Sequence, residues 1–285
     1  MPLISLIALP GQLEPALVSS LQGAFGAIGD AIWLSPDEAA EFPVSTCPDN
    51  LSDVRKSVSD HKVDLNFVAD DDRRKALLIA DMDMTMIEQE CIDELADEAG
   101  VGPRVAEITV RAMNGDLDFE EAVRERVGLL KDMPVDVVTR VLETRITLAP
   151  GGRTLVQTMK ANGARTALVS GGFTQFATAV GNQLGFDETH ANTLLAADGK
   201  LTGDVARPNL GRDAKVGILN RLSPDPSRAI AVGDGANDLG MIERAGMGVA
   251  LHAKPVVANA APLRIDHADL SALLFLQGYA RDEFV

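Results

Sequence analysis

Cysteine is scarce in this sequence, with only Cys47 and Cys91 among 285 residues. Two cysteines supply neither a disulfide framework nor a zinc cluster, and such low usage is typical of a reducing compartment. Aromatic residues make up only 4% of the chain, with one tryptophan and one tyrosine. This scarcity argues against the aromatic stacking platforms that bind single-stranded nucleic acid.

Positively charged residues are fewer than negatively charged ones, and long hydrophobic runs are lacking. Lysine and arginine total 26 against 42 aspartate and glutamate, a formal net charge of −16. A surface this acidic repels nucleic acid and anionic lipid, so we expect neither as a partner. No stretch approaches the roughly 18 apolar residues that a membrane span requires. No lysine or arginine precedes the apolar start MPLISLIALP, so we expect no signal peptide and a cytoplasmic location.

Residues 1–69 predict a small α+β domain. Strand-like and helical patterns succeed one another over residues 3–9, 13–28, 32–34, 51–59 and 63–68. The charge run DDDRRK at residues 70–75 is predicted to be a solvated linker that does not pack. A charged loop inside a single domain is the alternative.

Residues 76–285 show a different pattern, in which short apolar runs alternate with helical stretches. The runs lie at residues 76–81, 165–170, 228–234, 247–251 and 261–266, and the predicted helical stretches include residues 153–162, 174–184 and 214–222. This alternation predicts an α/β fold, a Rossmann-like parallel sheet with helices on both faces. About sixty residues with helical periodicity, 87–148, separate the first two strands, too many for a simple crossover. We therefore expect an inserted helical subdomain.

The first predicted strand ends in DMDMT, which contains Asp81 and Asp83. Side chains at positions i and i+2 of a strand project the same way, so two carboxylates can converge there. Both stay ionised near neutral pH only with a cation beside them, and an oxygen-only site suits Mg²⁺. Taken alone, the pattern is equally compatible with a polar strand-to-helix turn.

Two further strand ends carry polar residues. Ser170 and Gly171 begin a Ser-Gly-Gly turn that opens a helix, where backbone N–H groups attract an anion. Alone, this turn is more often an ordinary serine cap. Asp234 and Asp238 lie in GDGAND, whose glycines let carboxylates approach a metal. Lys215, just upstream on a helix, is by itself most simply a solvated residue.

Taken together, these motifs point to phosphoryl transfer. Ligands of parallel sheets bind beyond the carboxyl ends of the strands, and every motif except Lys215 lies at such an end. The set contains a nucleophile, a metal site, anion donors and a compensating positive charge, which are the parts this chemistry requires.

Four longer stretches contain these motifs or lie in the inserted segment: DMDMTMIEQECIDELA, MNGDLDFEEAVRERVGLL, LVSGGFTQF and VGDGANDLGMI. Through them, residues 76–285 resemble the phosphoserine phosphatase family of the haloacid dehalogenase-like superfamily. The resemblance implies a helical cap at about residues 87–148. It also implies Mg²⁺-dependent hydrolysis of O-phospho-L-serine through an aspartyl-phosphate, the last step of serine biosynthesis. Residues 1–69 resemble the ACT-like domains often attached to such enzymes, which implies regulation or a homodimer.

The resemblance also implies roles for the residues at the strand ends. Asp81 would be the nucleophile, and Asp83 would protonate the leaving serine oxygen and then activate water. Mg²⁺ would be held by Asp81, Asp234 and the Asp83 carbonyl, with Asp238 close behind. The phosphate and substrate would be bound or oriented by Ser170, Gly171, Lys215 and Asn237.

The inserted segment implies the substrate. Glu90 would bind the serine amine and Arg126 its carboxylate, an arrangement suited to a zwitterion. The alternative for both is an exposed charge on a helix. Met113 and Phe119 match the apolar residues that close over the site. Met84 departs from the family pattern, which commonly has serine there, so cap fit or turnover could differ.

Three other functions compete with this interpretation. One is transfer of the phosphoryl group to another hydroxyl acceptor, such as homoserine. Another is hydrolysis of sugar phosphates, for which Glu90 and Arg126 have no obvious use. The third is a catalytically silent amino-acid sensor. The sequence argues against it, because it retains all of Asp81, Asp83, Lys215 and Asp234.

Overall fold

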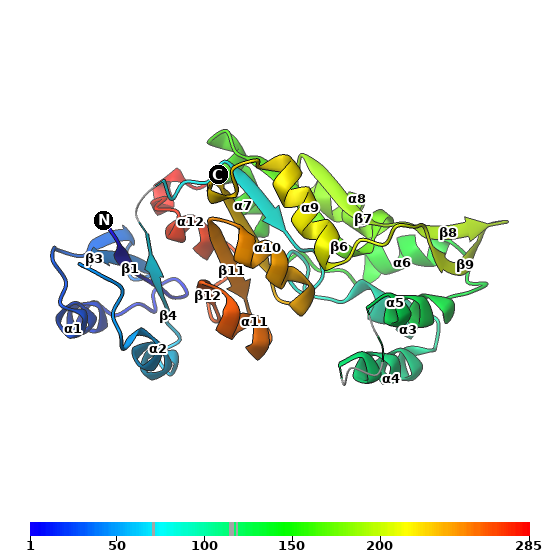
Figure 1. The fold of residues 1–285 in the computed structure, drawn as a ribbon, viewed down its shortest axis with the longest axis horizontal. Coiled ribbons are helices and arrows are strands. Elements are labelled where there is room, and N and C mark those ends of the chain that lie inside the picture. The colour runs from blue at the N-terminus through cyan, green and yellow to red at the C-terminus, as the bar shows by residue number, and fades with distance from the viewer. Residues whose placement is uncertain (70–71, 114–116, 118) are drawn as a thin grey trace. The chain divides into compact units, whose positions relative to one another are not determined.

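The computed structural model describes residues 1–69, 72–113, 117 and 119–285, apart from the side chains of residues 112, 113 and 119 (Figure 1). The chain forms two compact units. The first comprises Met1–Ile79, Pro150–Thr166 and Leu219–Val285, and the second comprises Ala80–Ala149 and Ala167–Ile218.

A six-stranded sheet carries the strands predicted from the apolar runs. Its order is β12-β11-β10-β5-β6-β7. The strands are β5 (Leu77–Ala80), β6 (Arg165–Phe173), β7 (Glu188–Asn192), β10 (Ala229–Gly233), β11 (Met247–Leu251) and β12 (Leu263–Ile265). β10 pairs with β11, β11 with β12 and β6 with β7 in parallel. The predicted α/β fold with a parallel sheet is confirmed.

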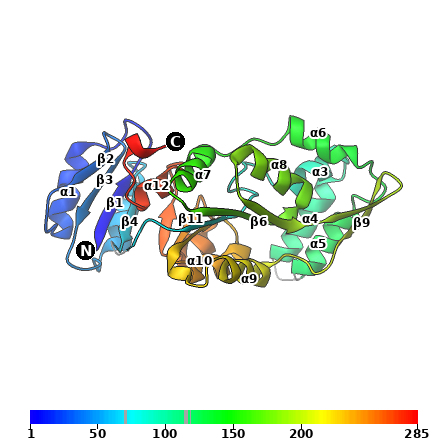
Figure 2. The same cartoon turned by 90° about the horizontal axis from the view of Figure 1, so that it is seen from above.

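Helices flank this sheet because their apolar stripes bury against its continuous apolar strands. They are α7 (Gly152–Ala161), α8 (Thr174–Leu184), α9 (Arg212–Leu222), α10 (Leu239–Arg244), α11 (Pro255–Ala260) and α12 (Ala272–Leu276). Within the first unit, α7 and α10 lie on opposite faces of β11 (Figure 2). The predicted helices at residues 153–162, 174–184 and 214–222 match α7, α8 and α9 closely.

The N-terminal part of the first unit is a four-stranded antiparallel sheet with the order β2-β3-β1-β4. Its strands are β1 (Leu3–Ile7), β2 (Ile32–Ser35), β3 (Ala39–Pro43) and β4 (Asp64–Val68). Helices α1 (Pro15–Phe25) and α2 (Leu51–Ser59) lie beside it (Figure 1). Ile4, Leu6, Leu21, Phe42 and Leu65 are buried in their shared core. This arrangement agrees with the predicted small α+β domain.

Strand β4 is joined to the chain around β12 by two buried side chains. The Asn66 amide accepts a hydrogen bond from the Arg264 N–H and donates one to the Arg264 carbonyl, both at 2.8 Å. The Asp64 carboxylate accepts the N–H groups of Asp266 at 2.7 Å and Ala268 at 2.8 Å. Both segments belong to the first compact unit, so the division into units does not separate residues 1–69 from the six-stranded sheet. The domain limits at residues 69 and 76 therefore stay a prediction.

The charge run at residues 70–75 differs from expectation in its described part, residues 72–75. Arg73 is largely buried and forms a bidentate pair with Glu41 at 2.7 and 2.8 Å. Lys75 is buried as well, and its Nζ donates to the Asp72 carbonyl at 2.6 Å. The expectation that this run is solvated and does not pack is wrong there. A charge buries without great cost when an opposite charge or a carbonyl satisfies it.

The second unit contains the helices expected between residues 87 and 148. They are α3 (Cys91–Glu98), α4 (Gly102–Met113), α5 (Phe119–Gly128) and α6 (Asp136–Thr144). An antiparallel bridge between Ile87 and Leu148 brings the two ends of this interval together. Within the described residues, no helix is both long and apolar enough to cross a membrane.

The hairpin of β8 (Leu194–Ala197) and β9 (Lys200–Val205) was not predicted. Asp198 and Gly199 form its turn with positive φ angles of 51° and 75°. An Asp-Gly pair is among the strongest signals for a two-residue hairpin turn, because this turn needs positive φ at both positions. The signal was therefore present in the sequence.

Candidate active site

Asp81 follows β5 directly and is buried. Its Oδ1 accepts hydrogen bonds from the Lys215 ammonium at 2.7 Å and from the Met82 N–H at 2.8 Å. The Lys215 side chain, in the first turn of α9, is 0% exposed. Lysine is almost never fully buried unless it is paired, so its interpretation as a solvated helix residue is wrong. The two donors orient the Asp81 carboxylate.

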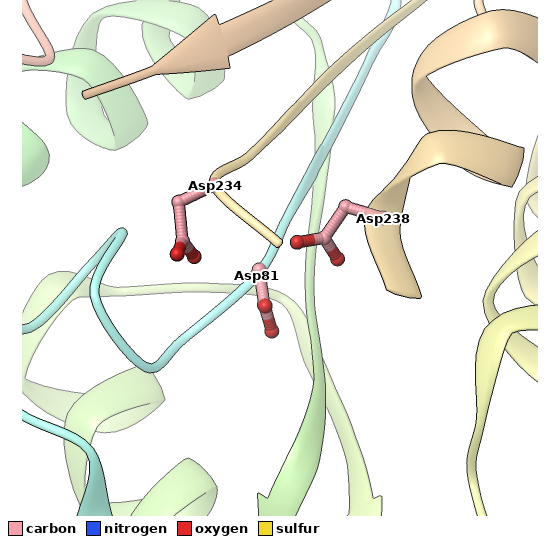
Figure 3. Close-up of side chains that lie close together, drawn as sticks. All are labelled: Asp81, Asp234 and Asp238. Carbon is pink, nitrogen blue, oxygen red and sulfur yellow. The ribbon is translucent and has the colours of Figure 1, made fainter. Parts of the chain in front are cut away.

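Asp234 and Asp238 bring two more buried carboxylates, one after β10 and one at the end of a 3₁₀ turn (Ala236–Asp238). One oxygen from each of Asp81, Asp234 and Asp238 lies within 4.8 Å of the other two (Figure 3). Gly233 permits this packing, since a Cβ there would lie 2.4 Å from Asp238 Cγ. Asp238 Oδ2 also accepts the Gly235 N–H at 3.0 Å.

The donor set of this acidic cluster, Asp81, Asp234 and Asp238, fits a hard divalent cation. All three groups offer carboxylate oxygen, which Mg²⁺ prefers. Three carboxylates this close repel one another, and one lysine balances only part of their charge. A bound cation would relieve the remaining repulsion.

The Asp83 carboxylate makes different contacts. Its Oδ1 accepts the Cys91 N–H at 2.9 Å, and its Oδ2 accepts the Ser170 hydroxyl at 3.0 Å. Gly172 makes room for it, because a Cβ at that position would lie 2.6 Å from Asp83 Oδ2. The Asp83 side chain therefore faces the Ser-Gly-Gly segment. The group of Asp83 that is implied to bind the metal is its backbone carbonyl.

The Ser-Gly-Gly segment lies inside β6, which runs to Phe173 and not to the predicted end at Ser170. The register with β7 shifts there: Val169 is opposite His190, and Phe173 is opposite Asn192. Three residues of β6 thus bulge opposite one residue of β7. Strand pairing resumes beyond the bulge, which explains why the strand continues. Ser170 Oγ accepts the Gly172 N–H at 2.8 Å within it.

The residues implied to bind the serine part lie on or next to helices of the second unit. Glu90 is the half-buried residue before α3, and Arg126 is half-buried on α5. Asp93, which the sequence analysis did not single out, lies in the first turn of α3. Burial raises the pKa of Asp93, while the positive charge of Arg126 opposes that shift. Its only sequence signal is that it follows Glu90 by three residues.

Four other positions stand out in the sequence. The side chains of Met113 and Phe119 lie outside the described residues. Asn237 is half-buried in the 3₁₀ turn between Asp234 and Asp238. Met84, where the family pattern is interrupted, is 45% exposed and has a positive φ of 54°.

Cys91 provides a test of this local structure. Burial and the neighbouring Asp83 carboxylate raise the pKa of its thiol far above the ordinary value, whereas Cys47 is exposed. Since the thiolate is the reactive form, we expect one thiol per native chain to react with a disulfide reagent, even at alkaline pH, and two after denaturation. Peptide mass spectrometry should place the native label on Cys47. Rapid native labelling of Cys91 would contradict the described packing.

Comparisons with known proteins bear on this site. A family model described as haloacid dehalogenase-like hydrolase matches residues 78–243, and a second model with the same description matches residues 214–274. The first match includes Asp81, Asp83, Ser170, Lys215, Asp234 and Asp238.

Several curated relatives of this chain are named phosphoserine phosphatase. The protein from Streptomyces coelicolor is 43% identical over 227 residues, which cover 78% of this chain and 55% of the relative. The protein from Methanocaldococcus jannaschii is 40% identical over 71% of this chain and 98% of its own length. The chain spans 55% to 62% of the length of three of its curated relatives.

Among solved structures, a haloacid dehalogenase family hydrolase from Salmonella enterica serovar Typhi has a TM-score of 0.87 and 30% identity. The match covers 99% of each chain. It therefore includes the N-terminal sheet as well as the six-stranded sheet.

Proposed function

The chain belongs to the haloacid dehalogenase-like hydrolase family, and we propose that it is a phosphatase that hydrolyses O-phospho-L-serine to serine and phosphate with Mg²⁺. The observation that carries the proposal is the buried Asp81 carboxylate, held by Lys215 within the acidic cluster. The names and coverage of the relatives support phosphoserine as the substrate.

Asp81 would act as the nucleophile. One of its oxygens attacks phosphorus, the bond from phosphorus to the serine oxygen breaks, and an aspartyl-phosphate forms. Covalent catalysis of this kind replaces one difficult displacement with two easier ones. The hydrogen bonds from Lys215 and the Met82 N–H hold the carboxylate in one orientation for the attack.

Asp83 would transfer the protons. It gives a proton to the serine oxygen as that oxygen leaves, and then takes a proton from the water that attacks the aspartyl-phosphate. The second displacement breaks the bond between phosphorus and the Asp81 oxygen and releases phosphate. The Cys91 N–H holds the Asp83 carboxylate in position between these steps. The Ser170 hydroxyl, which donates to Asp83 in this structure, has a single proton and would turn it to the phosphate when substrate is bound. Such acid–base transfer contributes about 10²- to 10⁴-fold.

The remaining groups would bind the phosphate and the serine part. Ser170, the Gly171 N–H and Lys215 donate to phosphate oxygens, while Asn237 orients the substrate. Asp81, Asp234, Asp238 and the Asp83 carbonyl would hold Mg²⁺, which when bound offsets the negative charge of the phosphoryl group. Glu90 would bind the amine and Arg126 the carboxylate of serine.

The decisive experiment compares O-phospho-L-serine with a sugar phosphate, in the presence of Mg²⁺, for the wild type and Arg126→Ala. We expect the wild type to release phosphate from phosphoserine. In the variant, kcat/KM for phosphoserine should fall about 10- to 100-fold, because hydrogen bonds between charged groups are lost. Hydrolysis of the sugar phosphate should remain equally low in both proteins.

Arg124→Ala is the matched control, since Arg124 lies on the same helix and is exposed. Hydrolysis of the sugar phosphate but not of phosphoserine would show that the substrate assignment is wrong. Product analysis with added homoserine separates hydrolysis from phosphoryl transfer. Inactivity on every substrate would favour a silent sensor. The cytoplasmic location and the homodimer stay predictions, the latter to be tested by sedimentation.

A further inference from the structure

Asn192, at the carboxyl end of β7, is a buried residue whose amide joins two segments of the proposed site. Its Nδ2 donates to the Gly171 carbonyl at 2.8 Å and, at a longer 3.4 Å, to the Leu210 carbonyl. Its Oδ1 accepts the Leu210 N–H at 2.6 Å. One side chain therefore satisfies backbone groups from both segments.

The first of these segments needs such a partner. Because β6 bulges between Val169 and Phe173, regular pairing with β7 does not set the orientation of the Gly171 peptide. The Asn192 amide binds the Gly171 carbonyl instead. A peptide group is planar, so fixing the Gly171 carbonyl also fixes the direction of the Gly172 N–H, which donates to the Oγ of the proposed phosphate ligand Ser170 at 2.8 Å.

The second segment leads into α9. Leu210 lies two residues before the helix begins at Arg212, and the Lys215 N–H donates to the Gly211 carbonyl at 3.2 Å. The position of this first turn determines where the Lys215 side chain starts its path to Asp81. The Asn192 amide binds both the N–H and the carbonyl of Leu210.

We propose that Asn192 is a positioning residue for phosphate binding, which fixes the bulged Gly171 peptide relative to the start of α9. It makes no contact with the reacting atoms in this role. It acts through the backbone of one phosphate-binding segment and through the helix that carries Lys215. The proposal extends the proposed function and rests on it for its kinetic readout.

Asn192→Asp is the sharpest test, because aspartate has the same shape and still accepts the Leu210 N–H. Its second oxygen faces the Gly171 carbonyl without a proton to donate. We expect kcat for phosphoserine to fall about 10- to 100-fold, as is common when a group that supports the reacting residues is lost. The dissociation constant of inorganic phosphate with Mg²⁺, measured by calorimetry, should rise about tenfold. Asn192→Ala, which removes both bonds without adding charge, should show the same losses.

Asn66→Ala is the matched control. Asn66 is also a buried asparagine whose amide binds the N–H and the carbonyl of one residue, Arg264, but it lies in β4. Its loss should lower the melting temperature about as much as Asn192→Ala does. The kcat and the phosphate dissociation constant should nevertheless match those of the wild type.

The outcomes separate this inference from the proposed function. If both Asn192 variants keep the wild-type kcat and phosphate affinity and lose only thermal stability, as Asn66→Ala does, the positioning role is overturned. Failure of the wild type to bind phosphate would overturn it as well. If the wild type binds phosphate and the Asn192 variants bind it more weakly, but phosphoserine is not hydrolysed, the substrate assignment fails and the positioning role stands.

Discussion

Replacing Asp81 by asparagine should abolish phosphate release from O-phospho-L-serine. Asparagine has the same shape and its oxygen can still accept the hydrogen bonds from Lys215 and the Met82 N–H, so the surroundings should persist. A neutral amide cannot attack phosphorus, and we expect kcat to fall by at least about 10⁴-fold, as in other nucleophile replacements. Steady-state phosphate release measures the loss.

A second measurement identifies the role of Asp81. Acid quenching of the wild type during turnover of ³²P-labelled phosphoserine should leave label on the protein, and Asp81→Asn should retain none. Asp213→Asn, an exposed aspartate in the first turn of α9, serves as the control with normal activity and labelling. Labelling of the Asp81→Asn protein, or turnover close to that of the wild type, would show that another group is the nucleophile.

Replacing Lys215 by methionine should reduce both activity and stability. Methionine fills similar space but removes the ammonium that lies 2.7 Å from Asp81 Oδ1. Loss of a charge that stabilises the transition state typically lowers kcat by about 10²- to 10³-fold. Leaving a buried carboxylate without its partner typically costs about 3–5 kcal/mol of unfolding free energy. Denaturant titration and kinetics measure the two effects.

Mg²⁺ gives this second prediction a diagnostic feature. Since the acidic cluster loses its compensating charge in Lys215→Met, added Mg²⁺ should restore part of the lost melting temperature. Lys56→Met, at a side chain that is 78% exposed, should change neither activity nor the response to Mg²⁺. An unchanged melting temperature of Lys215→Met without metal would mean that the pair with Asp81 contributes little.

Several elements were predictable because local physics determines them. The strands β5, β10 and β11 are continuous apolar runs, and the helix α8 follows a clear helical period. Other strands were not predicted, because pairing with distant segments determines their conformation. β3 has the weak strand sequence AAEFP and owes its conformation to pairing with β1 and β2 on either side. β7, at the sheet edge, is polar and half-exposed.

The candidate site shows the same division. The Asp81, Ser170 and Asp234 motifs stand out because glycines and paired polar groups follow apolar strands. Asn192 has no such signal, since a single asparagine in ETHAN resembles an ordinary turn residue. Its proposed positioning role depends on a bulge in β6 and on the position of Leu210, which are both distant in the sequence.

The sequence by itself determined the fold class, the apolar strands that precede the proposed site residues and the residue types that suit phosphoryl transfer, because each depends on neighbours within a few positions. Only the tertiary structure decided that Lys215 is buried against Asp81 and that Asp83 faces Ser170. It likewise decided that Asn66 binds Arg264 and that Arg73 packs on Glu41. Burial and pairing between distant segments set the energy of a charged or polar group, and no local pattern specifies either.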